Sequence, residues 1–212
     1  MLTGLLVVWI ACTAAVQSSP TAANTPPATL LQLGGSAAAL FVTAQTGEWK
    51  QAAAQVADIQ RSLDDIPASI GPGDVRAQLH RRVSALRRSV ARRQAVLVMR
   101  SANDVTRLAA ELEGSFGTAV PFELKLLDYY GRQIQIGIAA RRLSIVQQAT
   151  RDIRQRWNAL RPRVERLGRT DDARRFTDIV VGLERARQLA DAAPLAVAEL
   201  NAVDQLERAF GG

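Results

Sequence analysis

A run of arginines between residues 76 and 100 is the most prominent chemical feature of the sequence. Its members are Arg76, Arg81, Arg82, Arg87, Arg88, Arg92, Arg93 and Arg100. No Asp or Glu stands between Asp74 and Asp104, so no acidic residue of the same segment can neutralise them. Guanidinium groups bind carboxylates and phosphates through paired hydrogen bonds. The run therefore predicts an anion-binding surface, whose candidate residues are Arg81, Arg82, Arg88, Arg92 and Arg93.

The partner expected for this surface is an anionic membrane surface or an acidic partner in the cell envelope. Nucleic acid is disfavoured because only 5% of the residues are aromatic, which leaves few rings to stack on bases. The alternative interpretation is that acids on neighbouring helices, such as Asp58, Asp64 or Glu184, neutralise the arginines. In that case the charged surface only keeps the protein soluble.

A second group of polar residues lies where the apolar patterns of the central helices falter. Its candidate ligand-binding members are Asn103, Asp104, Asp128, Tyr130, Arg132 and Arg142. Polar groups near a core need partners, so we expect them to form one hydrogen-bonded layer. One interpretation is a small pocket for a ligand or metal, with Arg132 or Arg142 paired to a carboxylate or phosphate. The other is an internal Arg–Asp network that only fixes the register of the helices.

Residues for catalysis or for a resident metal are scarce. The single histidine, His80, has no carboxylate one turn away, whereas metal-binding bundles use Glu-x-x-His pairs. With one cysteine, Cys12, neither an intramolecular disulfide nor a cysteine-rich metal site is possible. The Gly71-Pro72-Gly73 segment is too short for a phosphate-binding loop. We therefore expect no cofactor, no metal and no enzymatic activity.

The apolar residues from residue 36 onward recur at steps of three and four, which is typical of amphipathic helices. No segment alternates with a period of two, so no sheet is expected. The stripes predict helices over residues 36–66, 74–112, 121–167 and 171–210. Short connections favour an all-α, antiparallel four-helix bundle with long second and third helices. Pro194 is expected to break the fourth helix.

A weak internal repeat accompanies this pattern. The stripe that begins at Trp49 resembles the one at Trp157, and each is followed by an acidic pair and another stripe. Two pseudo-symmetric helical hairpins would explain the likeness. Chance agreement between alanine- and leucine-rich helices is the alternative.

The N-terminus differs in composition from the rest. Residues 2–16 are mostly apolar but shorter than the ~20 residues that a membrane-spanning helix needs. They fit the apolar core of an export signal. Uncharged, proline-containing residues follow and are typical of a flexible tether. We therefore divide the chain into a signal (1–15), a tether (16–35) and a helical bundle domain (36–212).

The segment Trp9-Ile10-Ala11-Cys12 resembles the lipobox of bacterial lipoproteins, although Trp9 departs from the usual leucine and no basic residue precedes it. The resemblance implies that Cys12 is lipidated and anchors an exported protein in the cell envelope, on the periplasmic or extracytoplasmic side. The alternatives are ordinary cleavage near Ala14, which would remove Cys12, and an uncleaved apolar N-terminus.

The body of the chain is also similar to uncharacterised bacterial lipoproteins with a helical bundle after the tether. The residues that carry this likeness are Ser101-Ala102-Asn103-Asp104, Leu126-Leu127-Asp128-Tyr129-Tyr130-Gly131-Arg132 and Trp157. The likeness implies no particular activity. With a net charge of +7, the sequence favours a basic, non-enzymatic binding or scaffold protein of the envelope.

Overall fold

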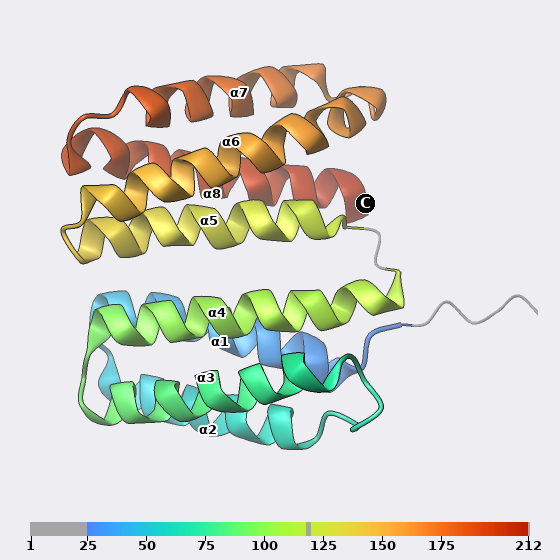
Figure 1. The fold of residues 1–212 in the computed structure, drawn as a ribbon, viewed down its shortest axis with the longest axis vertical. Coiled ribbons are helices and arrows are strands. Elements are labelled where there is room, and N and C mark those ends of the chain that lie inside the picture. Colours follow the sequence, from blue (N-terminus) through green and yellow to red (C-terminus); the bar gives the residue numbers. More distant parts are fainter. Residues whose placement is uncertain (1–24, 118–119, 212) are drawn as a thin grey trace, which may run out of the picture.

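The computed structural model describes residues 25–117 and 120–211, and Figure 1 shows their helices. The first four are α1 (Ala28–Thr46), α2 (Trp49–Asp64), α3 (Gly73–Ala91) and α4 (Ala95–Glu113), followed by the short η1 (Gly114–Phe116). The last four are α5 (Phe122–Ala139), α6 (Leu143–Arg166), α7 (Thr170–Arg185) and α8 (Leu189–Gly211). These described ranges contain no strand, which confirms the all-α class.

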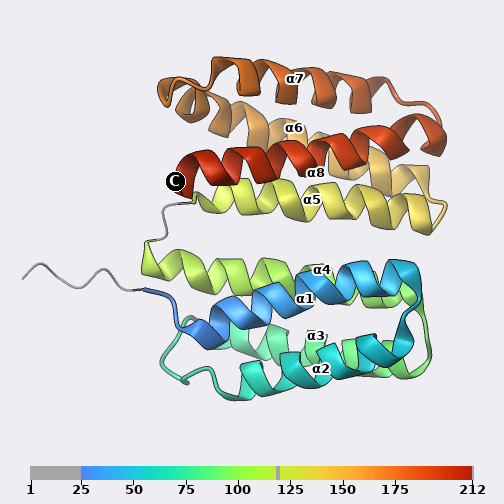
Figure 2. The ribbon, with the colours of Figure 1, turned by 180° about the vertical axis from the view of Figure 1, so that it is seen from behind.

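The helices form two bundles, one of α1–α4 and one of α5–α8, each with its own apolar core. The two bundles lie one above the other, and α4 packs against α5 between them (Figures 1 and 2). The expected single four-helix bundle with long second and third helices is therefore wrong. Each expected rod is instead a pair of antiparallel helices.

The tight turns that divide the expected rods explain this error. Gly47 ends α1 in the left-handed conformation, which glycine adopts without steric cost because it has no side chain. Arg93 (φ 53°) divides α3 from α4, and Arg141 (φ 55°) divides α5 from α6. Arginine seldom adopts a positive φ, so neither turn is visible in the sequence. The apolar spacing continues across both turns, which made each pair look like one helix.

The helix expected over residues 171–210 is broken at residues 186–188. The expected break near Pro194 is therefore wrong. The Asp191 carboxylate accepts hydrogen bonds from the backbone N–H groups of Arg187 (3.2 Å) and Gln188 (3.0 Å). A side chain that reaches back in this way fixes the start of a helix, here that of α8. Pro194 then falls within the first two turns of α8 and does not interrupt it.

The N-terminal boundary of the first bundle also differs from the expected one. Helix α1 begins at Ala28, inside the segment 16–35 expected to be a tether. Leu30 and Leu33 are fully buried in the first core, so this part of the tether assignment is wrong. The signal segment, the rest of the tether up to residue 24 and Cys12 lie outside the described residues.

The alternating direction of the helices gives the molecule two distinct ends (Figures 1 and 2). One end carries the four turns α1–α2, α3–α4, α5–α6 and α7–α8. The opposite end carries the start of α1 and the final turn of α8. Trp49 and Trp157 both lie in the second helix of their bundle, but Trp49 begins α2 whereas Trp157 lies well inside α6, so the internal repeat stays a prediction.

Candidate functional site

The arginines expected to bind anions all lie on α3 or on the turn that follows it. Arg81, Arg88, Arg92 and Arg93 are exposed and form no ion pair within the described residues. Arg82 differs, because its Nε lies 3.2 Å from Asp104 Oδ2 on α4. The structure thus leaves most of the set available to a partner and assigns Arg82 to an internal contact.

The acids that had been considered as neutralising partners are engaged elsewhere. Asp58 pairs with Arg61, and Asp64 accepts a hydrogen bond from Gln60 on its own helix (2.9 Å). Glu184 accepts two hydrogen bonds from Arg154, each 2.7 Å long. These carboxylates therefore do not neutralise the arginines of α3.

The fold brings further arginines to the end where α3 meets α4. Arg141 and Arg142 lie in the α5–α6 turn, and Arg185 and Arg187 lie at the α7–α8 turn (Figure 1). All are exposed and without an ion pair in the described part of the chain. We call the following set the arginine end: Arg88, Arg92, Arg93, Arg141, Arg142, Arg185 and Arg187.

Three members of this set, Arg141, Arg185 and Arg187, were not among the sequence candidates. They are far apart along the chain, and only the topology brings their turns to one end of the molecule. Their signal in the sequence is an arginine at a helix junction, which is informative only once the junctions are known. Arg142 was expected in the polar layer, but it is exposed and lies at the arginine end.

Acidic side chains do little to offset the charge of the arginine end. Glu184 is bound to Arg154, and Asp191 is bound to the backbone at the start of α8. Glu48 in the α1–α2 turn is exposed. This end therefore carries an excess of positive charge.

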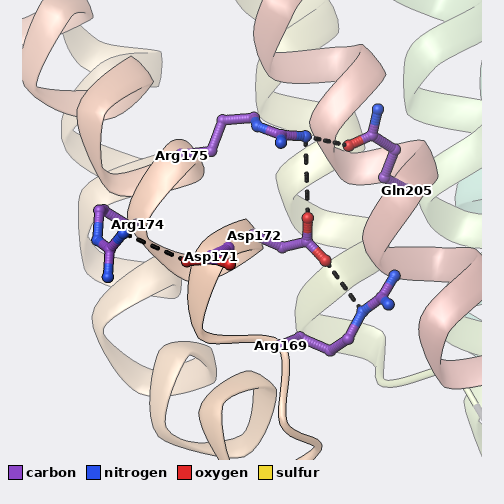
Figure 3. A network of polar contacts seen from close by, with 6 residues as sticks. All are labelled: Arg169, Asp171, Asp172, Arg174, Arg175 and Gln205. Carbon is purple, nitrogen blue, oxygen red and sulfur yellow. Dashed lines mark hydrogen bonds and ion pairs between the residues drawn. The ribbon is translucent and has the colours of Figure 1, made fainter.

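At the opposite end of the second bundle, in contrast, arginines pair with neighbouring aspartates (Figure 3). Asp172 lies 2.9 Å from Arg169 Nε and 3.8 Å from Arg175 NH1. Arg174 NH1 pairs with Asp171 (3.2 Å), and Arg175 also donates to Gln205 on α8 (2.9 Å). Both aspartates lie in the first turn of α7, where the helix dipole favours negative charge. Arg166 and Arg208, near this end, have no such partner.

The polar layer expected between the central helices forms in part, at the contact of α4 with α5. Asn103 is fully buried and donates from Nδ2 to the carbonyl oxygen of Tyr129 (2.9 Å). The Tyr129 hydroxyl donates to Asp104 Oδ1 (3.2 Å). Burial and the Asp104 charge raise the pKa of Tyr129 to about 12, so the hydroxyl keeps its proton. This network joins the two bundles.

An open cleft of about 590 Å³ lies beside this network, between the two bundles. Helices α3 and α4 form one wall, and α5 and α6 form the other. The residues lining the cleft are Arg82, Arg100, Asp104, Tyr129, Tyr130, Gln133, Ser144, Ile145, Gln148, Ala149 and Asp152. Its volume is in the range of small-molecule sites.

The remaining candidates, Asp128 and Arg132, lie outside this cleft and line a smaller cavity of about 250 Å³. Arg132 NH2 is 3.1 Å from Asp128 Oδ2, and its guanidinium lies over the Phe41 ring. Burial raises the pKa of Asp128, although Arg132 opposes the shift. The structure therefore separates this pair from Asn103, Asp104 and Tyr130.

Sequence reasoning missed Glu199 on α8, which is fully buried. Neither of its carboxyl oxygens has a hydrogen-bond partner among the described residues. Burial first, and then the charges of Asp128 and Asp204, raise its pKa well above the usual value. Burial therefore favours the neutral, protonated form of this carboxyl group.

Other potential sites are few. His80 is exposed, and the residues described contain no group of three His, Cys, Asp or Glu side chains that could hold a metal ion. Of the helices described, none has both the length and the apolar character needed to cross a bilayer. Comparison of the chain with protein-family models, curated proteins and solved structures finds no match.

Proposed function

We propose that this chain is a non-enzymatic, exported protein of the cell envelope that binds an anionic phospholipid surface through its arginine end. In this proposal Cys12 carries the lipid anchor, as the lipobox-like segment implies. The observation that carries the binding role is the set of exposed arginines, without ion pairs among the described residues, that the α3–α4, α5–α6 and α7–α8 turns bring to one end.

Electrostatics supports such a surface. A basic side chain close to an anionic bilayer contributes about 1 kcal/mol to the binding free energy. Several arginines acting together can therefore hold the protein on such a surface. Exposed charges are screened over about 8–10 Å at physiological ionic strength. Binding is therefore expected to weaken steeply as salt is added.

The backbone of two members of the arginine end supports a role for their side chains. Arg93 and Arg141 have positive φ angles, which glycine adopts without cost. A long side chain there costs roughly 1–2 kcal/mol. An arginine at such a position in both turns is hard to explain by stability alone.

Vesicle binding tests the proposal. The probes are phosphatidylcholine vesicles with and without phosphatidylglycerol, titrated at several salt concentrations. We expect salt-sensitive binding to the anionic vesicles only. The double variant Arg92→Glu with Arg141→Glu should bind at least about thirtyfold more weakly, because it removes two favourable charges and adds two repulsive ones.

A matched control makes the same change of net charge at the other end. Arg166→Glu with Arg208→Glu should bind as the wild type does. The variant Arg93→Gly with Arg141→Gly should lose affinity while keeping or raising the unfolding temperature, so that loss of fold cannot explain the loss. Equal losses in both Glu pairs would contradict the proposal.

Two further outcomes bear on the identity of the surface and the anchor. If the protein ignores vesicles but binds soluble polyglutamate through the same arginines, the partner is an acidic protein and the lipid assignment is wrong. Mass spectrometry of the mature N-terminus should find an acylated Cys12. An unmodified Met1 would contradict export and anchoring.

A further inference from the structure

The cleft between the two bundles contains one cation and one anion that are not paired with each other. Arg100, on the α4 wall, is exposed and has no ion pair within the described residues. Asp152, on the α6 wall, accepts only hydrogen bonds from Gln148 Nε2 (3.2 Å to each oxygen). The other two charges of the cleft, Arg82 and Asp104, form an ion pair. Among the described residues, one positive and one negative group on opposite walls thus have no ion-pair partner.

Other residues that line the cleft provide apolar surface. The Tyr129 and Tyr130 rings meet edge to face, with centroids 5.1 Å apart. Ile145 and Ala149 of α6 provide aliphatic surface. Tyrosine faces attract ammonium groups, and aliphatic groups favour an apolar ligand side chain.

Two residues that line the cleft, Asp104 and Tyr129, are held in place before any ligand binds. Asp104 is fixed from two sides, by Arg82 of α3 and by the Tyr129 hydroxyl of α5. The Asn103 amide holds the backbone carbonyl of Tyr129. A site whose groups are already fixed loses less entropy on binding.

We propose that this cleft binds a free amino acid with an apolar or aromatic side chain. The ligand carboxylate pairs with Arg100, its ammonium group lies between Asp152 and the Tyr130 ring, and its side chain rests on Ile145 and Ala149. A simple anion would leave the Asp152 charge facing it, and a simple cation would face Arg100. Only a zwitterion satisfies both free groups.

Calorimetric titration of the full chain with three related probes tests this. L-Phenylalanine carries both charges, N-acetyl-L-phenylalanine lacks the ammonium group, and L-phenylalaninamide lacks the carboxylate. We expect L-phenylalanine to bind, and each blocked probe to bind at least about tenfold more weakly, as the loss of one charged hydrogen-bonding group implies.

Two variants assign each ligand charge to a residue. Arg100→Gln should weaken L-phenylalanine at least about tenfold and abolish its advantage over the amide. Asp152→Asn should abolish the advantage over the N-acetyl probe. Arg81→Gln, on the exposed surface outside the cleft, is the matched control and should change nothing. Circular dichroism confirms that each variant is folded.

Several outcomes would overturn the proposal. These are a flat titration with L-phenylalanine and L-leucine, equal affinity for a blocked probe, or equal losses in Arg100→Gln and Arg81→Gln. Glucose binding at the same concentrations would assign the cleft to sugars instead. The variant Arg92→Glu with Arg141→Glu should leave amino-acid binding intact, so that the cleft and the arginine end are tested separately.

Discussion

Glu199 is an acidic residue in a fully buried environment. A Cβ atom built on Gly131 of α5 would lie only 1.9 Å from its Oε2. Because its pKa is raised, the folded protein holds a proton there that the unfolded chain releases above about pH 4.5. Stability from this group is therefore complete below that pH and is lost as the pH rises toward the raised pKa.

Replacing Glu199 by glutamine, its neutral isostere, should remove this loss of stability at rising pH. In Glu199→Gln the free energy of unfolding at about pH 7 is expected to rise by on the order of 1 kcal/mol, with little change at about pH 4. Urea unfolding at a series of pH values measures it. Burial also raises the pKa of Asp128 and Glu113, so part of the wild-type slope persists.

The exposed Glu48→Gln serves as the control for this series and should leave the pH dependence unchanged. If Glu199→Gln and the wild type lose stability in parallel between about pH 5 and pH 8, the buried carboxyl is not the source of the slope.

At the residue scale, the sequence shows which side chains could bind a ligand or react, but it does not show which of them pair with each other. Arg82 and Arg81 are adjacent, yet only the antiparallel packing of α3 on α4 brings Arg82 to Asp104. Glu199 had a visible signal, because it falls on the apolar line of Ala196, Val203 and Leu206. An acid on a core line is the feature that sequence reading should have noted.

At the scale of the helices, apolar periodicity located nearly all the helical residues but not the turns between them. The α3–α4 and α5–α6 turns contain arginine where a glycine would be expected, and their hydrogen bonds follow one pattern. The backbone N–H of Gln94 donates a hydrogen bond to the carbonyl oxygen of Ser89 (3.0 Å), and that of Arg142 donates to the carbonyl oxygen of Gly137 (2.8 Å). Because arginine seldom adopts the positive φ that both turns require, the residue types at these positions did not indicate a turn.

The α5–α6 hairpin depends on the absence of a side chain at Gly137. A Cβ atom there would lie 2.8 Å from Val146 Cγ2 and 3.0 Å from the Val146 backbone nitrogen. We expect Gly137→Ala to lower the free energy of unfolding by about 1–3 kcal/mol, because the two helices would have to separate. Urea unfolding followed by circular dichroism measures this loss.

A second glycine gives the matched control for this substitution. In α1, a Cβ atom at Gly35 would contact nothing, so Gly35→Ala should stabilise the protein by up to about 1 kcal/mol. Similar stability of the two alanine variants would show that the close approach of α5 and α6 is not needed.

At the scale of the whole molecule, the two bundles meet mainly where α4 packs against α5. Phe41 and Gln45 of α1 add contacts to Arg132 and Gln135 of α5. Ile136 of α5 is fully buried and belongs to the core of the first bundle. Its side chain therefore links the stability of one bundle to the other. The all-helical class was correctly predicted from the apolar periodicity. The number of bundles was not, because it depends on which helix faces pack together, and periodicity along the chain carries no information on that pairing.

Removal of this link should uncouple the bundles. Ile136→Ala is expected to lower the free energy of unfolding by about 2–5 kcal/mol. It should also separate two unfolding transitions that we expect to coincide in the wild type. Trp49 packs against the first core and Trp157 lies in the second. Fluorescence of single-tryptophan variants, each also carrying Trp9→Phe, follows each bundle alone.

The same single-tryptophan variants without the Ile136 substitution are the reference for this experiment. Coincident transitions in both the reference and the Ile136→Ala proteins would mean that the remaining α4–α5 contacts suffice to couple the bundles.

The start of α1 and the arginine end lie at opposite poles of the molecule (Figure 2). Helix α1 alone, with 19 residues, separates them by about 28 Å. The chain between Cys12 and Ala28 can span at most about 58 Å when fully extended. In the proposed function, a lipid anchor on Cys12 and the arginine end would thus act from opposite poles. Such a protein would hold two membrane surfaces apart more readily than it would lie flat on one.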